Sequence, residues 1–160
     1  MKRCQKGFSL IELLIVVAII LIIAAIAIPN LLRARMQANE ASAVSSIHAI
    51  NTAELSYSST FPAVGYAAAL TNLGDGGTTP CPGTSAASCY LDSVLVTGTK
   101  SGYSFVYTQD TSSTPSTHYT INANPIAQGI SGQRNFYSSD LNVTRFNIGV
   151  AATSADAPLQ

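Results

Sequence analysis

A run of 21 residues, Phe8 to Ile28, is apolar apart from Ser9 and a single carboxylate, Glu12. An α-helix rises about 1.5 Å per residue, so this run would extend roughly 31 Å, close to the hydrocarbon thickness of a bilayer. The run therefore predicts a membrane-spanning helix. A charge costs about 2.5–3.5 kcal/mol at the centre of such a helix, so Glu12 requires a functional explanation.

The residues before the run are basic and end in a glycine, because Lys2, Arg3 and Lys6 precede Gly7. Positive charge of this kind favours the cytoplasmic side of a membrane. A secretory signal peptide has an apolar region of about 7–15 residues followed by a cleavage site. Here the apolar run is longer and the break falls before it. A signal peptide and a permanent single-span anchor are the alternatives to the interpretation that follows.

The segment from Lys6 to Ile20, KGFSLIELLIVVAII, resembles the class III signal of type IV prepilins and type II secretion pseudopilins. In that family a membrane peptidase cuts after the glycine and methylates the new amino terminus. The resemblance implies cleavage between Gly7 and Phe8 and N-methylation of Phe8. It also implies that Glu12 takes part in assembly and that Pro29 kinks a long helix.

Cleavage at this position would leave a positively charged amine on Phe8, and Glu12 follows one helical turn later. We therefore hypothesise that Glu12 offsets the Phe8 amine of a neighbouring subunit in an apolar filament core. A paired charge is tolerable there and an unpaired one is not. The alternative is that Glu12 pairs within its own chain or reaches the membrane surface.

Strong helix formers resume after Pro29, and no further glycine or proline occurs before Pro62. We predict one kinked helix from about Ser9 to Tyr57, whose second half is amphipathic and packs on a globular domain. Its apolar stripe comprises Leu32, Met36, Val44, Ile47 and Ile50. The predicted segments are a leader peptide at 1–7, a membrane or filament-core helix at 8–29, an amphipathic helix at 30–60 and a β-rich globular domain at 61–160.

The C-terminal half contains short segments in which alternate residues are apolar, the period of a half-buried strand. They begin at Tyr103, Tyr119, Phe136 and Val143, and the turns between the later ones lie at Gly129, Gly132 and 139–142. This pattern predicts an antiparallel meander on one face of the helix. The fold class is therefore α+β, with a long N-terminal helix packed on a small antiparallel sheet, as the resemblance to pilins also implies.

Two later segments extend the resemblance to pilins. Residues 102–107 look like a strand of major pilins, and residues 132–146 resemble their closing hairpin. Asn142 stands where glycine is commoner in that hairpin, and asparagine also tolerates a left-handed turn. The sequence Asn142-Val143-Thr144 is in addition an N-glycosylation sequon, which indicates a surface position.

Cysteine usage agrees with export from the cytoplasm. Cys4 lies in the leader peptide at 1–7, hereafter the stub. Cys81 and Cys89 then remain as an even pair in a loop rich in proline and glycine. We predict that they form a disulfide, which suits an oxidising compartment. Two free thiols or half of a zinc site are the alternatives, although the spacing does not favour zinc.

Charge and motifs argue against several function classes. Loss of the stub removes three of eight cations and leaves five Lys and Arg against eight Asp and Glu, a balance of −3. The basic footprint of a nucleic-acid-binding protein is therefore missing, and so are the common enzyme motifs. Asp75, Asp92 and Asp140 do not have EF-hand spacing. We expect no enzyme, no cofactor, no assigned metal site and no specific nucleic-acid partner.

The sequence as a whole predicts a structural filament subunit. The resemblance implies a single-pass precursor in the bacterial inner membrane, a prepilin peptidase, an assembly platform with a motor, and a helical homopolymer in an extracellular type IV pilus. Adhesion, twitching motility and DNA uptake are the roles that this class implies. A pseudopilin of type II secretion is the first alternative. A membrane-tethered periplasmic binding or enzymatic domain is the second.

Overall fold

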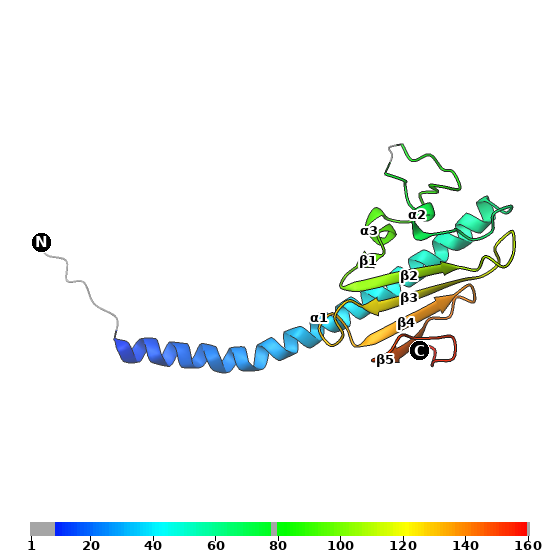
Figure 1. Cartoon of the computed structure of the whole chain (residues 1–160). Coiled ribbons are helices and arrows are strands. Elements are labelled where there is room, and N and C mark those ends of the chain that lie inside the picture. Colours follow the sequence, from blue (N-terminus) through cyan, green and yellow to red (C-terminus); the bar gives the residue numbers. More distant parts are fainter. Residues whose placement is uncertain (1–8, 78–79, 160) are drawn as a thin grey trace, which may run out of the picture. The chain divides into compact units, whose positions relative to one another are not determined.

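The computed structural model describes residues 9–77 and 80–159 of the 160-residue chain (Figure 1). The chain divides into two compact units, Met1–Arg35 and Met36–Gln160. The described part of the first unit is helical throughout from Leu10. The second unit, hereafter the head, contains every strand of the described residues.

The long helix α1 comprises Leu10–Thr60 and contains Pro29 without interruption of its helical assignment. Its bounds lie within three residues of the predicted ones, because no glycine and no second proline stops the helix before Thr60. A proline inside a helix removes one backbone hydrogen bond. The kink expected at Pro29 stays a prediction.

The head is built on a five-stranded antiparallel sheet in which strand order follows chain order (Figure 1). The strands are β1 (Thr99–Lys100), β2 (Tyr103–Gln109), β3 (Tyr119–Pro125), β4 (Arg134–Ser139) and β5 (Arg145–Ile148). The register places Phe105, Ala123, Phe136 and Phe146 opposite one another across four neighbouring strands. The predicted meander and the α+β fold class are confirmed.

The C-terminal half of α1 packs on one face of this sheet and forms the core with it (Figure 1). Ile47 and Ile50 of the helix are fully buried, as are Ile121 and Phe136 of the sheet. Burying a large aliphatic or aromatic side chain contributes about 1.5–3 kcal/mol, so this helix–sheet interface is the main source of the head's stability.

The structure corrects several details of the predicted pattern. β4 begins two residues before Phe136, and β5 begins two residues after Val143. The apolar stripe is right at Ile47 and Ile50; Leu32 belongs to the first unit and is 53% exposed. The buried positions of α1 also include four polar residues, Glu40, Ser46, Asn51 and Glu54. Apolar spacing could not find them, because their burial depends on partners in the sheet and the loops.

Three short elements were not predicted: β1, α2 (Leu70–Leu73) and α3 (Ser93–Val96). They lie in the connection between α1 and β2 and bury Leu70, Leu73 and Leu95. Elements of two to four residues carry too few periods to be recognised in a sequence. Asp92 caps α3 by accepting a hydrogen bond from the backbone N–H of Val94 at 2.8 Å.

The same connection contains the disulfide between Cys81 and Cys89, whose Cα atoms are 6.3 Å apart. The predicted pairing is therefore present. The disulfide loop is also tied to neighbouring elements: the hydroxyl of Tyr57 at the end of α1 donates to the carbonyl of Ser85 at 2.7 Å. The backbone N–H of Cys89 donates to the carbonyl of Gly74 at 2.9 Å.

We expect the double variant Cys81→Ser/Cys89→Ser to lower the free energy of unfolding of the head. The disulfide joins residues separated by 8 positions, and a loop of this length corresponds to about 2–3 kcal/mol in the chain-entropy account. Urea unfolding of the full chain in detergent, followed by near-UV circular dichroism of the tyrosines, measures the change. An unchanged midpoint and slope would show that the disulfide does not restrict the unfolded head.

Candidate functional site

The N-terminal half of α1 exposes hydrocarbon around its whole circumference. Between Leu10 and Leu32 every large apolar side chain is between 46% and 80% exposed. Of the described residues, only this helix is long and apolar enough to cross a membrane. Such a surface is stable only when lipid or other apolar helices cover it, since it has no polar face to turn toward water.

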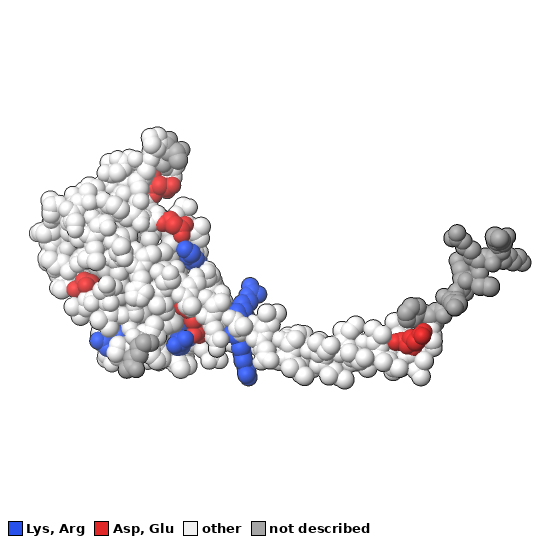
Figure 2. Space-filling model, turned by 180° about the vertical axis from the view of Figure 1, so that it is seen from behind, with Lys and Arg blue, Asp and Glu red and all other residues white. Residues whose placement is uncertain are grey.

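Charge on this stretch is confined to its two ends. Glu12 lies in the first turn of α1, and the next charged residues along the chain are Arg33 and Arg35. Figure 2 shows the uncharged surface between an acidic end and a basic end on the face that it presents. Both arginines are exposed. If this stretch of α1 is embedded in an apolar environment, Arg33 and Arg35 therefore lie at the boundary of that environment.

Glu12 makes a local contact in the single chain. Its Oε2 atom accepts a hydrogen bond from the backbone N–H of Ser9 at 3.0 Å, and the N–H of Leu13 donates to the carbonyl of Ser9 at 3.3 Å. This is the carboxylate half of a capping box, in which a residue in the first turn satisfies an amide that has no partner in the helix. The contact lies within one chain.

A carboxylate offers about four acceptor positions, and the bond from Ser9 occupies one of them. Glu12 therefore retains the capacity to bind a cation while it caps the helix. The predicted cleavage and methylation positions, Gly7 and Phe8, lie outside the described residues. The pairing of Glu12 with a Phe8 amine stays a prediction.

In the head, Glu40 fastens α1 to the beginning of β4. Its Oε1 atom accepts from the backbone N–H groups of Gln133 at 2.8 Å and Arg134 at 3.2 Å. Its Oε2 atom accepts from Nε of Arg134 at 2.7 Å. Burial raises the pKa of Glu40, but these donors outweigh burial and hold the pKa below its ordinary value. Glu40 is therefore ionised and paired at neutral pH.

Glu54 lies 14 residues after Glu40 on α1, and its pKa is shifted in the opposite direction. It is fully buried, and its Oε2 atom accepts from the backbone N–H of Ala67 at 3.0 Å. Its Oε1 atom has no hydrogen-bond partner within the described part of the chain. Burial raises the pKa of Glu54 to about 7, and the Ala67 bond reduces that shift only in part.

Asn51 is a further buried polar residue that joins α1 to other parts of the head. Its Nδ2 atom donates to Oγ of Ser138 at 3.0 Å and to Oδ1 of Asn142 at 2.8 Å. Its Oδ1 atom accepts from the hydroxyl of Tyr119 at 3.0 Å. One amide thus connects α1 with β3, β4 and the β4–β5 turn, and buried networks of this kind specify one packing arrangement.

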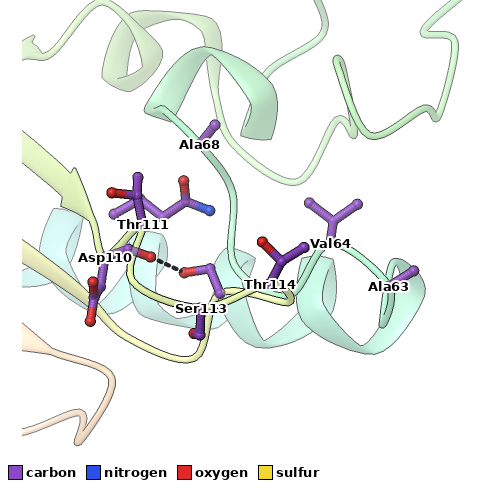
Figure 3. Close-up of a pocket in the computed structure, with 9 residues that line it drawn as sticks. Ala63, Val64, Ala68, Asp110, Thr111, Ser113 and Thr114 are labelled. Carbon is purple, nitrogen blue, oxygen red and sulfur yellow. Dashed lines mark hydrogen bonds between the residues drawn. The ribbon is translucent and has the colours of Figure 1, made fainter.

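A shallow pocket of about 350 Å³ lies beside the β2–β3 connection (Figure 3). Its wall combines the small apolar residues Ala63, Val64 and Ala68 with hydroxyl side chains of 111–116. Asp110 is the only titratable residue among those that line it, and its Oδ1 atom accepts from the backbone N–H of Ser112 at 2.8 Å. The carbonyl of Asp110 accepts from Oγ of Ser116 at 2.9 Å, which holds the connection in place.

The two histidines lie in different surroundings. His118 lies just before β3, and its Nδ1 atom is 3.0 Å from Oδ2 of Asp140. His48 is an exposed residue of α1. Among the described residues no group of three His, Cys, Asp or Glu side chains could hold a metal ion. The tyrosines of β2 and β3 pack mainly in the core.

Comparison with known proteins supports the interpretation of the N-terminal segment. Residues 2–28 match the prokaryotic N-terminal methylation motif. The type IV wide pilus major component of Thermus thermophilus is 68% identical over 38 residues, which cover 24% of this chain and 29% of that protein. The type IV major pilin protein of Myxococcus xanthus is 48% identical over 53 residues, covering 33% of this chain and 24% of that protein.

A fimbrial protein of Pseudomonas aeruginosa is 53% identical over 51 residues, which cover 32% of this chain and 33% of that protein. The chain thus spans a quarter to a third of the length of these curated relatives, and no solved structure matches it significantly.

The motif and the long helix packed on an antiparallel sheet together define a protein of the pilin class. Over its N-terminal third the chain is similar to type IV pilins and a fimbrial protein, and its fold is pilin-like.

The bonds that Glu40 accepts from Gln133 and Arg134, hereafter the clamp, predict a specific loss of stability when Glu40 is replaced. We expect Glu40→Ala to lower the free energy of unfolding of the head by about 2–4 kcal/mol, because it leaves two backbone donors and a guanidinium without their partner. The control is Lys100→Met, which breaks the exposed ion pair between Lys100 and Asp92. Asp92→Ala breaks the same pair but also removes the cap of α3, so it is the less specific comparison. The control should change stability by less than about 1 kcal/mol. Equal effects in urea unfolding would contradict the clamp.

Glu54 predicts a pH dependence whose sign follows from its raised pKa. The folded head binds this proton up to pH 7 or so, whereas the unfolded chain releases it near the ordinary value of 4.5. Stability from this group is therefore fully present below pH 4.5 and is lost as the pH rises through about 7, by about 3 kcal/mol in total. Glu54→Gln should remove this fall in urea unfolding between pH 4.5 and 8. A parallel fall in the variant would assign it to another group.

Proposed function

We propose that this chain is the structural subunit of a type IV pilus filament, held together through the apolar surface of its N-terminal helix. The observation that carries the proposal is an exposed apolar helix headed by one carboxylate, within a segment that matches the methylation motif. In the precursor, lipid covers this surface. In the filament, the same surface of neighbouring subunits covers it, so the hydrocarbon stays dry in both states.

The processing step follows from the same segment. A peptidase removes residues 1–7, cuts between Gly7 and Phe8, and methylates the new amino terminus. Removal of the stub takes away Lys2, Arg3 and Lys6, the cations that hold the precursor's start on the cytoplasmic side. Residues 8–29 then form the filament core, residues 30–60 the amphipathic helix, and residues 61–160 the globular domain. Pro29 kinks the helix between the first two of these segments.

Glu12 sets the register of assembly in this proposal. After cleavage the only new charge near the start of the helix is the Phe8 amine, and Glu12 is the only carboxylate of the apolar run. An uncompensated charge in an apolar core costs several kcal/mol, so an incoming helix is stable only where amine and carboxylate of neighbouring subunits meet. The bond that Glu12 accepts from Ser9 is compatible with this second role, because it leaves further acceptor positions open.

The partners follow from the life of such a subunit. The precursor lies in the inner membrane as a single-pass protein and meets the prepilin peptidase and then an assembly platform with its motor. The mature protein is part of an extracellular fibre made of copies of itself. Adhesion, twitching motility or DNA uptake would be properties of that fibre. The pocket beside the β2–β3 connection carries no argument for one of them.

The first experiment is intact-mass measurement and N-terminal sequencing of protein sheared from the native cells. A chain that starts at N-methyl-Phe8 in the sheared fraction supports both processing and a surface filament. Mature protein that stays in the cell envelope, together with a protein-secretion defect on deletion, would favour a type II secretion pseudopilin. A chain that still starts at Met1 and stays in membranes would favour a tethered domain and overturn the proposal.

Glu12 variants separate its two possible roles. We expect Glu12→Ala and Glu12→Gln both to insert in the membrane and both to abolish surface filaments, because each removes the negative charge. Glu12→Gln keeps a side-chain carbonyl that can accept the bond from Ser9, so it preserves the helix cap. Electron microscopy and immunoblots of sheared and membrane fractions measure the outcome. Normal filaments from Glu12→Gln would mean that capping, not charge, is what assembly requires.

A further inference from the structure

The turn between β4 and β5 carries a sequence signal that filament assembly does not use. Asn142-Val143-Thr144 is the only Asn-x-Ser/Thr sequence in the chain with a residue other than proline at the middle position. We propose that Asn142 is an N-linked glycosylation site, whose carboxamide nitrogen accepts an oligosaccharide from a lipid-linked diphosphate donor. The inference rests on the proposed function in one respect, namely export of the head across the membrane.

The position of Asn142 suits a large substituent. It lies in the connection between Ser139, the last residue of β4, and Arg145, the first residue of β5. Asn142 is exposed, and its neighbours Leu141 and Val143 are 75% and 39% exposed. A φ of 56° and a turn hydrogen bond from its N–H to the carbonyl of Ser139 at 2.8 Å hold it at the turn.

The side chain of Asn142 is oriented for modification at nitrogen. Its Oδ1 atom accepts from Nδ2 of Asn51 at 2.8 Å, so the carbonyl side of the amide faces α1. Its Nδ2 atom donates no hydrogen bond within the described part of the chain. Glycosylation replaces one hydrogen of Nδ2 and leaves the carbonyl as an acceptor. The bond to Asn51, and with it the buried network, is therefore preserved when a sugar is attached.

Thr144 supplies a second and independent observation. Its side chain is buried, at 7% relative exposure, and its Oγ1 atom has no hydrogen-bond partner among the described residues. A buried hydroxyl without a partner costs about 1–3 kcal/mol, and valine would occupy the same volume without that penalty. The fold therefore gives no reason for a hydroxyl at this position. The sequon requires one two residues after the acceptor asparagine.

The burial of Thr144 also sets the order of events. The N–H of Leu159 donates to the carbonyl of Thr144 at 2.8 Å, and the N–H of Phe146 donates to the carbonyl of Ala157 at 3.1 Å. The C-terminal segment thus lies against residues 144–146. A transferase that must reach the Thr144 hydroxyl acts before this segment docks, so modification precedes completion of the head.

The chemical step balances with the donor named above. The nitrogen of Asn142 forms a bond to the anomeric carbon of the oligosaccharide while the bond from that carbon to the phosphate oxygen breaks. The lipid diphosphate leaves with the electron pair, and the carboxamide nitrogen loses one proton. Neither an oxidant nor a reductant is needed.

The test uses protein from the native cells, digested with trypsin. Cleavage after Arg134 and Arg145 releases residues 135–145, which contain Asn142 and no other sequon. We expect this peptide to carry a sugar that peptide:N-glycosidase removes, converting Asn142 to Asp with uptake of heavy oxygen from labelled water. A peptide that is wholly unmodified, or a sugar located on a serine or threonine and resistant to this enzyme, would overturn the inference.

Matched variants separate the sequon from the fold. Thr144→Ser should remain modified, and Thr144→Val should lose the modification while the head stays at least as stable in urea unfolding. Asn142→Asp keeps an oxygen acceptor for Asn51 and should also lose the modification. Persistence of the sugar in Thr144→Val would contradict the proposal. The N-terminal peptide in the same digest distinguishes the two proposals: mature Phe8 with unmodified Asn142 refutes this inference alone, and a Met1 start with modified Asn142 refutes the filament proposal alone.

Discussion

Hydrocarbon cannot stay in contact with water around the whole circumference of a helix, and α1 presents such a surface from Leu10 to Leu32. This constraint requires a surrounding of lipid or of other apolar helices, whatever else the chain does. It also accounts for the charge pattern, with Glu12 at one end of the stretch and Arg33 and Arg35 at the other. The similarity of the chain to type IV pilins lies in the segment that contains this helix.

The C-terminal half of the same helix meets a different requirement, because it must be fixed to a sheet. Apolar packing at Ile47 and Ile50 supplies most of the cohesion, but it is not directional. Glu40, Asn51 and Glu54 supply direction, since each bonds to a different part of the head. The two carboxyl groups have opposite pKa shifts, because burial dominates at the more deeply buried Glu54, whereas at Glu40 the donors on both oxygens outweigh burial. The head is consequently sensitive to pH from both sides.

Much of the fold follows from local patterns in the sequence. The helix could be predicted because Leu31 to Thr60 contains neither glycine nor proline, and β2 and β3 could be predicted because their apolar residues alternate over five or more positions. The elements α2, α3 and β1 are too short to carry a period. The buried polar residues of α1 gave no signal, because glutamate on a helix is usually exposed, and a buried one is stable only when its partners arrive from distant positions.

The sequence by itself determined where the chain is apolar, where it is charged, where helix-forming residues continue without a break, and which cysteines form an even pair. These are properties of neighbouring residues, and they suffice for the class of protein. Only the tertiary structure decided that Glu40 is clamped by Arg134 and that Glu54 is left half-satisfied. It also decided that the hydroxyl of Thr144 is buried without a partner beside an exposed Asn142. The reason is that burial and hydrogen bonding depend on residues about 10 to 90 positions away, whose approach no local pattern records.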